Sequence, residues 1–212
     1  MSMNITFNTA NNPEAPILVL ATRSGEKLGQ LNAENIVCND SLKEASELSF
    51  RVRKYLNGKK TDLWNKLVNF KLVWCKNYDT WFQITVDIDE SDETIKNVLG
   101  VRLGEAELSQ IMLYDIEINT EDDIARDNYK ITVLFNQNDK EASLLHRIME
   151  KAPHYSVIHV DSTIKNIQRT FTFNNTSIYD ALQEIGEETG CLFIFNPDSD
   201  ENGSIQSTIS VY

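Results

Sequence analysis

The chain has 212 residues, of which 41% are hydrophobic and 25% are charged, values that are ordinary for a globular protein. This length allows one large domain or two small ones, and either can bury a core without disulfide bridges. The 20 basic and 32 acidic side chains give a formal charge of −12, which argues against a grip on nucleic acid or on an anionic membrane surface.

The first 15 residues form a polar lead that is rich in Asn and Thr. They have neither the basic leader nor the apolar core of a signal peptide. The longest apolar run, residues 15–21, is far shorter than the ~20 residues that a membrane helix needs. Cys38, Cys75 and Cys191 are odd in number and far apart, which favours a reducing compartment over a disulfide framework.

Residues 16–119 are expected to form a β-rich, barrel-like lobe. Ser24-Gly25-Glu26 between two apolar runs predicts a hairpin turn, and Asn57-Gly58 predicts a second turn after a half-buried strand at residues 48–52. Apolar and polar residues alternate over 70–75 and again over 82–89, which predicts a long antiparallel hairpin with one face in a core.

The alternation continues beyond this hairpin. Ile95, Leu99, Val101 and Leu103 keep the period of two, and Gly100 and Gly104 interrupt it, where we expect bulges or sharp bends. A further strand is predicted over residues 112–118. A sheet of this length can curl into a barrel.

Residues 120–212 are expected to form a smaller α+β lobe, so the fold class is α+β and β-rich. It opens with a polar, helical connection at Glu121-Asp122-Asp123. Two helices are then predicted, one over residues 144–149 that ends before Pro153, and one that begins at Ser177 with Asp180 in a capping box and ends at Gly190. The remaining β-like runs are residues 155–160, 169–173, 191–195 and 205–212.

No motif in the chain identifies a catalytic or metal-binding site. His146, His154 and His159 have no cysteine near them in sequence and no His-Glu-x-x-His pattern, so ordinary half-buried or surface histidines are the favoured interpretation over metal ligands or general bases. Gly-x-Ser-x-Gly and phosphate-binding glycine loops are absent, and the three cysteines read as packing residues. We therefore expect no catalytic residue, cofactor or metal.

Two acidic stretches were candidates for a cation site. Asp87, Asp89, Glu90, Asp92 and Glu93 are better explained as a solvated strand end and turn, because calcium ligands must converge from a bent loop. The second stretch, residues 198–203, matches the first half of a calcium loop, but Ile209 stands where a bidentate Glu is required. Asn202-Gly203 is also a strong hairpin turn.

The tryptophans Trp64, Trp74 and Trp81 all lie in the segment of the long hairpin. Trp74 and Trp81 could bind a sugar or stack on a base, but they stand among core-facing alternations. Core packing is therefore favoured, because base stacking in grooves is accompanied by positive charge.

Several segments share their order and spacing with one group of phage proteins. They are PILVL at residues 16–20, GEKLG at 25–29, ETIKNV at 93–98, LGEAELS at 103–109, LYDIEIN at 113–119, ASLLHRI at 142–148, IQRTF at 167–171 and SIYDALQEI at 177–185. Together with the Trp-rich hairpin, this series resembles the amino-terminal region of the minor structural, or tail-associated, proteins of Firmicute siphophages and prophages. The resemblance covers residues 16–212.

The resemblance implies a baseplate-hub fold with β-barrel lobes and an α/β insertion, assembled as a homotrimer at the virion tail tip after synthesis in the bacterial cytoplasm. It implies contacts with the distal tail protein and other tail components, and downstream lysin or receptor-binding domains. The last strand, residues 207–212, ends without a turn, so we expect the chain to be a fragment of a longer protein. A peptidase activity of the family is not carried over to these residues.

Two other readings stay open. A small cell-wall hydrolase would need a histidine, a nucleophile and a carboxylate within hydrogen-bonding reach in a cleft. A carbohydrate- or peptide-binding module would need Trp74 or Trp81 exposed. An assembly module needs instead an apolar or strand-edge surface that meets a partner.

Overall fold

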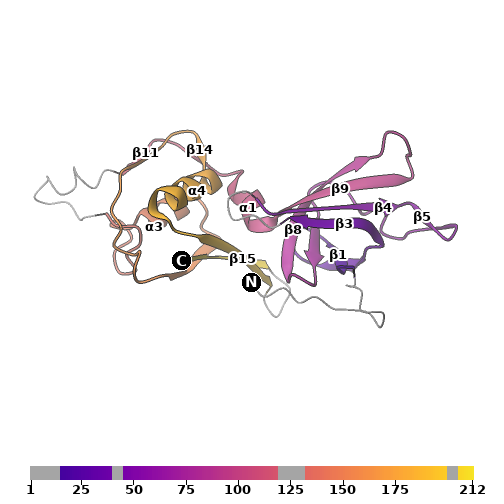
Figure 1. Ribbon diagram of the computed structural model, residues 1–212, viewed down its shortest axis with the longest axis horizontal. Helices are drawn as coiled ribbons and strands as arrows, with labels where there is room; N and C mark the ends of the chain where they lie inside the picture. The colour runs from indigo at the N-terminus through magenta and orange to yellow at the C-terminus, as the bar shows by residue number, and fades with distance from the viewer. Residues whose placement is uncertain (1–14, 40–44, 119–131, 200–204) are drawn as a thin grey trace, which may run out of the picture. The chain divides into compact units, whose positions relative to one another are not determined.

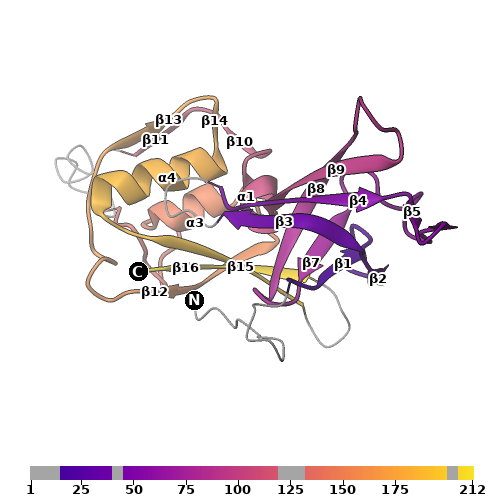
Figure 2. The same ribbon diagram turned by 45° about the vertical axis from the view of Figure 1, so that its right-hand side comes forward.

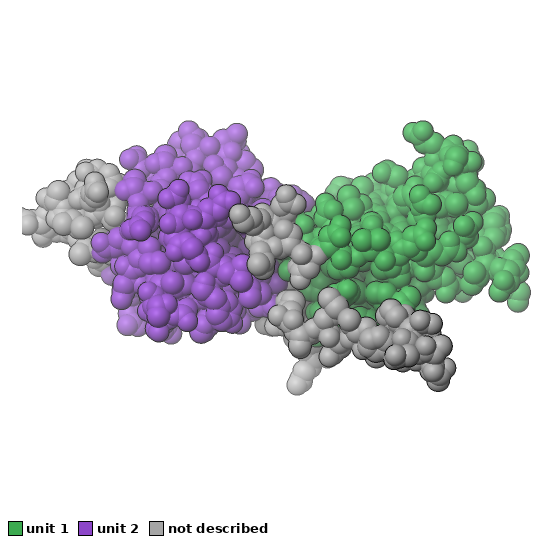
Figure 3. Space-filling model, viewed as in Figure 1, with its two compact units in different colours: residues 1–106, 197–205 green, residues 107–196, 206–212 purple. Residues whose placement is uncertain are grey.

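The computed structural model describes residues 15–39, 45–118, 132–199 and 205–212. The chain divides into two compact units, which are coloured separately in Figure 3. Unit 1 comprises Met1–Ala106 and Pro197–Ile205, and unit 2 comprises Glu107–Asn196 and Gln206–Tyr212. The sequence places the boundary near residue 119, whereas the units divide after Ala106.

The boundary differs because strands that continue the β pattern pair outside unit 1. β10 (Met112–Leu113) pairs with β14 (Thr176–Ser177), and β11 (Ile116–Ile118) pairs with β13 (Phe171–Phe173). Both partners come from unit 2. The predicted boundary rests on the local alternation of apolar and polar residues, which does not show which distant strands pair.

Unit 1 is built on a seven-stranded antiparallel sheet with the order β2-β1-β7-β8-β9-β4-β3 (Figure 1). Its strands, with the small hairpin β5–β6 that follows β4, are β1 (Leu18–Ala21), β2 (Lys27–Gln30), β3 (Ala33–Asn39), β4 (Glu47–Arg53), β5 (Tyr55–Leu56), β6 (Lys59–Lys60), β7 (Leu72–Cys75), β8 (Thr80–Ile88) and β9 (Ile95–Arg102).

The sheet curls because its two edge strands are consecutive in the chain. β2 and β3 lie at opposite ends of the strand order, yet only Leu31 and Asn32 join them. Three consecutive Cα–Cα steps span about 11 Å at most, so both edges must meet at this corner. Figure 2 shows β1 and β2 below β3 and β4 in this curled sheet. The predicted β-rich α+β class with a curled antiparallel sheet is confirmed.

One apolar cluster fills the inside of the curl. Its fully buried members include Leu20 on β1, Leu48 on β4 and Phe82 on β8, strands that are not all neighbours in the sheet. Trp64 and Leu67, from the turn before β7, belong to the same cluster. The core is therefore shared by both halves of the sheet, as expected for a barrel-like lobe.

The alternation predicts the inward face correctly on β8 and incorrectly on β9. Phe82 and Ile84 point into the core as expected. On β9, however, Lys96, Val98 and Gly100 are buried, whereas Leu99 is exposed.

Gly100 is not a bulge. The register across β9 is regular on both sides, and a Cβ atom at Gly100 would lie 3.0 Å from the Cβ of Phe82. The glycine is there because the core leaves no room for a side chain. Gly104 lies within α1 (Leu103–Leu108), a helix where the sequence predicts a continued strand.

The predicted turns and helix ends of the described residues are present. Ser24-Gly25-Glu26 joins β1 to β2, and Asn57 and Gly58 form the left-handed turn of the β5–β6 hairpin. In unit 2, the predicted helices are α3 (Leu144–Met149) and α4 (Ile178–Thr189). Ser177 Oγ accepts a hydrogen bond from the Asp180 N–H at 3.1 Å, and Gly190 ends α4 at a φ of 75°.

A three-stranded sheet completes unit 2, with the order β12-β16-β15 and a parallel β12–β16 pair. Its strands are β12 (Tyr155–Val160), β15 (Phe193–Ser199) and β16 (Ile205–Val211). They correspond to three of the predicted runs.

Some predictions lie outside the described residues. These are the polar lead over residues 1–14, the connection Glu121-Asp122-Asp123 and the turn Asn202-Gly203 with its half-matched calcium loop. Within the described part of the chain, no helix has the length and apolar character to cross a membrane.

Candidate functional site

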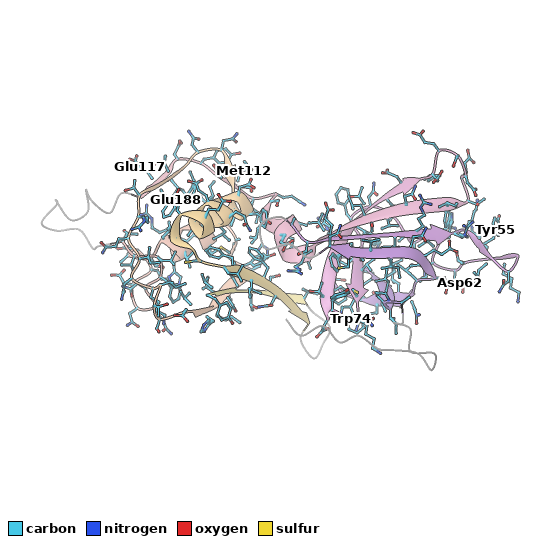
Figure 4. The ribbon with its side chains drawn as sticks, viewed as in Figure 1. Tyr55, Asp62, Trp74, Met112, Glu117 and Glu188 are labelled. Atoms are coloured by element: carbon cyan, nitrogen blue, oxygen red, sulfur yellow. The ribbon has the colours of Figure 1, made fainter. Side chains whose placement is uncertain are left out.

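Unit 1 has an open hollow of about 600 Å³ beside the corner where its sheet edges meet. One wall is β2 with the link to β3, and the other is the hairpin β5–β6 with the turn that follows, up to Trp64. Tyr55 and Asp62 lie at this end of the unit (Figure 4). Ligand pockets commonly have volumes of about 300 to 1,000 Å³, so this hollow is large enough to hold a ligand.

The hollow lies in a basic part of an acidic chain. Residues 51–76 contain eight basic side chains and one acidic one, Asp62, although the whole chain has a charge of −12. The basic residues are Arg51, Arg53, Lys54, Lys59, Lys60, Lys66, Lys71 and Lys76. Lys59, Lys60 and Asp62 line the hollow itself, and all three are exposed. The local charge therefore differs in sign from that of the chain.

A free strand edge lies along the same hollow. β2 is the last strand on its side of the sheet. The N–H of Leu31 donates to the carbonyl oxygen of Leu18 at 2.8 Å, and Gly29 is the register partner of Leu20. Because alternate residues of an antiparallel strand face opposite neighbours, the backbone groups of Gln30, the register partner of Val19, point away from β1. Leu28 is the extra residue where the register shifts between Leu20 and Ala21.

Lys96 supports the turn that forms the second wall. Its Nζ donates hydrogen bonds to the carbonyl oxygens of Trp64, at 2.9 Å, and Leu67, at 2.7 Å. The side chain is buried, and this burial lowers the pKa of its ammonium group. The sequence pattern does not predict the burial of Lys96, because a lysine in an alternating run is typical of a solvent-facing position.

The outer face of the sheet carries an uncharged row across four strands. Val37 on β3, Ser49 on β4, Leu99 on β9 and Thr85 on β8 are register partners. Val37 is 49% exposed and Leu99 is 46% exposed. The next row carries Arg51 on β4 and Asp87 on β8, so the uncharged row is bordered by charge.

A histidine, a hydroxyl and a carboxylate do come together in unit 2. The Tyr155 hydroxyl donates to Glu107 Oε2 at 2.8 Å, and His154 Nε2 lies 3.9 Å from the same oxygen, which is too long for a hydrogen bond. Burial, followed by the Glu107 charge, raises the pKa of Tyr155. The phenol is therefore held as a hydrogen-bond donor, which is the wrong state for a nucleophile.

The other two histidines lie in different surroundings. His146 on α3 stacks on Phe135 with ring centres 4.9 Å apart, and burial lowers its pKa. His159 on β12 packs against Tyr212 at 4.9 Å. Within the described residues, no three His, Cys, Asp or Glu side chains converge as metal ligands do.

The cysteines lie in or beside apolar clusters. Cys75 is fully buried in the core of unit 1, and burial raises the pKa of its thiol to about 11. Cys38 packs against the same core, and Cys191 is buried in unit 2. A thiol with a raised pKa is a poor nucleophile at neutral pH.

The acidic stretch between β8 and β9 forms local turns. Asp89 accepts hydrogen bonds from the Ser91 N–H, at 2.9 Å, and its hydroxyl, and Asp92 accepts the corresponding pair from Thr94. The bonds from Ser91 lower the pKa of Asp89 to about 2. Each of these two carboxylates therefore stabilises the turn in which it lies.

The tryptophans are covered. Trp64 is 6% exposed and Trp81 2% exposed, as the core-packing interpretation predicts. Trp74 is half-buried, with Lys27 Nζ 3.7 Å from its ring centre and its Nε1 donating to Asp79. Trp64 and Trp81 therefore offer no free ring face for a sugar, and Trp74 has a lysine over its ring.

Comparisons with known proteins assign no family. No family model matches the chain, and no curated protein matches it. Among solved structures, one similar chain comes from the structure of the Francisella PdpA-VgrG complex, half-lidded, with a TM-score of 0.41 and 12% sequence identity. The similarity covers 92% of this chain and 31% of that chain, so this chain spans less than a third of its neighbour's length.

Proposed function

We propose that this chain is a structural, non-enzymatic assembly module of a phage tail tip, of the baseplate-hub kind. In this role it joins the distal tail protein of the tail tube to downstream lysin or receptor-binding domains, as part of a homotrimer in the virion tail. The proposal starts from the ordered series of segments that resembles the minor structural proteins of Firmicute siphophages and prophages.

The observation that carries the proposal is the outer row of the unit 1 sheet. Val37 and Leu99 are large apolar side chains that stay nearly half exposed on a regular four-strand face. An apolar centre bordered by charged residues is the usual arrangement of a protein–protein interface. A tail protein must meet its neighbours over such a surface, whereas a free enzyme has no need of one.

The chemistry of the described side chains supports the same role. Tyr155 donates to Glu107, Cys75 is buried as a thiol, and Asp89 and Asp92 serve their own turns. These four reactive groups therefore have structural contacts. Lys96, the buried cation, likewise holds a turn in place.

The test is a calorimetric titration with the distal tail protein of the same phage. The double variant Val37→Asp/Leu99→Asp should bind at least about tenfold more weakly, because two carboxylates would be buried without partners. Ile158→Asp, which changes a comparably exposed apolar residue in unit 2, is the matched control and should bind like the parent. Equal binding by the double variant would contradict this docking face.

The hydrolase alternative makes a separate prediction. Steady turnover of peptidoglycan fragments by the purified chain, abolished in His154→Ala, would replace the structural role with an enzymatic one. We expect no turnover.

A further inference from the structure

We propose that the hollow of unit 1 binds an acidic polypeptide segment of another protein, which adds to the free edge of β2 as an extended strand. The inference does not depend on the tail-tip role, because the hollow and its edge belong to this chain alone. It also concerns a different surface from the outer row that carries Val37 and Leu99.

The backbone of β2 supplies the directional part of the site. Leu28 and Gln30 both line the hollow, and the antiparallel alternation turns the N–H and C=O groups of Gln30 away from β1. Within the described part of the chain, these two groups of Gln30 have no hydrogen-bonding partner on that side. An extended peptide pairs with such an edge through its own backbone.

The side chains of the hollow suit a strand whose residues alternate. Leu31, Val52 and Leu63 supply apolar lining, whereas Lys59 and Lys60 come from the β5–β6 hairpin on the other wall. Successive side chains of a strand point to opposite faces. An occupant that alternates acidic with apolar residues can therefore satisfy both kinds of lining.

The charge of the residues around the hollow indicates which charge its occupant carries. The hollow lies within the stretch that has eight basic side chains and one acidic one. Lys59 and Lys60 are exposed in its lining beside one carboxylate, Asp62, so the lysines are in excess. Oppositely charged rims steer a partner towards a site and exclude partners of the same sign. In a chain with a charge of −12, a local basic wall favours a carboxylate-bearing partner.

A polypeptide fits the hollow better than a nucleic acid does. Single-stranded nucleic acids are held by exposed aromatic rings on which the bases stack. The only aromatic residue lining the hollow is Trp64, which is 6% exposed and has Lys96 Nζ 4.6 Å from its ring centre. The lining therefore offers charge and a strand edge but no stacking platform.

The experiment uses the whole chain and a fluorescently labelled short peptide in which glutamate and valine alternate, followed by anisotropy at low salt. We expect saturable binding that weakens as salt is added, because exposed charges are screened. The variant Lys59→Glu/Lys60→Glu should weaken binding by about tenfold or more, since two attractions become repulsions. The matched control, Lys140→Glu/Lys151→Glu, makes the same charge change on exposed lysines of unit 2 and should bind like the parent.

Two further probes separate the parts of the proposal. A peptide N-methylated at every residue keeps its carboxylates but has no N–H group on either edge of its strand, and it should not bind. In the parent chain, amide hydrogen exchange at Gln30 should slow when the unmodified peptide is added, a result that needs no variant.

Several outcomes would overturn the inference. Equal binding by the lysine–valine counterpart of the peptide, or by the Lys59→Glu/Lys60→Glu variant, would remove the charge argument. Undiminished binding of the N-methylated peptide, or unchanged exchange at Gln30, would contradict strand addition. Tighter binding of an oligothymidine that displaces the acidic peptide would assign the hollow to nucleic acid. None of these results would alter the separate test with the distal tail protein.

Discussion

Lys96 Nζ lies 4.6 Å from the centre of the Trp64 ring and donates a hydrogen bond to the carbonyl oxygen of the same residue. One cation thus holds both the ring and the backbone of Trp64, and a second bond, to Leu67, secures the end of the turn. This turn forms part of the wall of the hollow. The shape of the hollow therefore depends on a lysine inside the core.

Replacing Lys96 should destabilise unit 1. In Lys96→Met the stem is retained, but the carbonyl oxygens of Trp64 and Leu67 lose their donor inside the core. We expect the free energy of unfolding to fall by about 1–3 kcal/mol, the usual cost of buried groups left unpaired. Urea unfolding measures the change, with Lys66→Met, an exposed lysine of the same turn, as the control. Equal stabilities of the two variants would contradict the role assigned to Lys96.

The β9 strand shows what the sequence could and could not predict. On β8 the large residues Phe82 and Ile84 face inward, so the apolar alternation predicts the core correctly. On β9 the inward positions hold Lys96 and Gly100, which read as polar and as a bulge. The carbonyl groups that receive Lys96 and the side chains that fill the space at Gly100 come from distant parts of the chain, which local periodicity cannot reveal.

In the candidate site, too, some features can be predicted from the sequence and others cannot. The basic stretch over residues 51–76 is visible in the sequence, and a running charge count would have found it. The β2 edge that lies beside it is not visible, because it depends on which strands end the sheet. The helix α1 has a sequence signal in Glu105, Ala106 and Glu107, which are better helix formers than strand formers, but Gly104 was interpreted as a bend.

We expect substitution of Gly100 to destabilise unit 1. In Gly100→Ala the new Cβ would lie 3.0 Å from the Phe82 Cβ and 3.4 Å from Ile84 Cγ2, and neither neighbour is the end of a flexible chain. We expect a loss of about 1–3 kcal/mol from overpacking, measured by thermal or urea unfolding. Ser49→Ala, on the outer face of the neighbouring strand β4, should change stability far less. If Gly100→Ala were as stable as the parent, the core of unit 1 would have room for a further methyl group.

The buried carboxylate of Glu105 should be equally sensitive. Its Oε2 accepts the Ser46 N–H at 2.6 Å, and its Oε1 lies 3.5 Å from Arg102 Nη1. Because Glu105→Ala leaves a buried N–H and a nearly buried guanidinium without this partner, we expect a loss of about 3 kcal/mol or more in unfolding free energy. Glu105→Gln keeps an acceptor for Ser46 and should lose less. If the two variants were equally unstable, the hydrogen bond to Ser46 would not be the contact that matters.

His146 should make unit 2 sensitive to acid. Burial lowers its pKa in the folded state, and the nearby Lys140 charge acts in the same direction. As pH falls below the ordinary histidine pKa of ~6.5, the imidazole is protonated in the unfolded chain before it is protonated in the folded chain. The free energy of unfolding therefore decreases as pH falls from ~6.5 to the lowered pKa of the folded state. In His146→Phe, which keeps a ring to stack on Phe135, this part of the pH dependence should disappear.

The measurement is urea unfolding of the parent chain and of His146→Phe from pH 7.5 down to pH 5. The difference in unfolding free energy between the parent and His146→Phe should be constant above pH 7. Below pH 7 the variant should become increasingly more stable than the parent as the solution becomes more acidic. His146→Gln should lose the same pH-dependent part without the stacking ring. Parallel curves for parent and variants would show that His146 does not set the acid sensitivity.

The central claim, that this chain is an assembly module, is tested most directly by the light-scattering mass of the chain mixed with the distal tail protein of the same phage. The structural role predicts a stoichiometric complex whose mass exceeds that of either component and that is lost when Val37 and Leu99 are both changed to Asp. A mixture that keeps the two separate masses at concentrations well above those of tail assembly would contradict the claim.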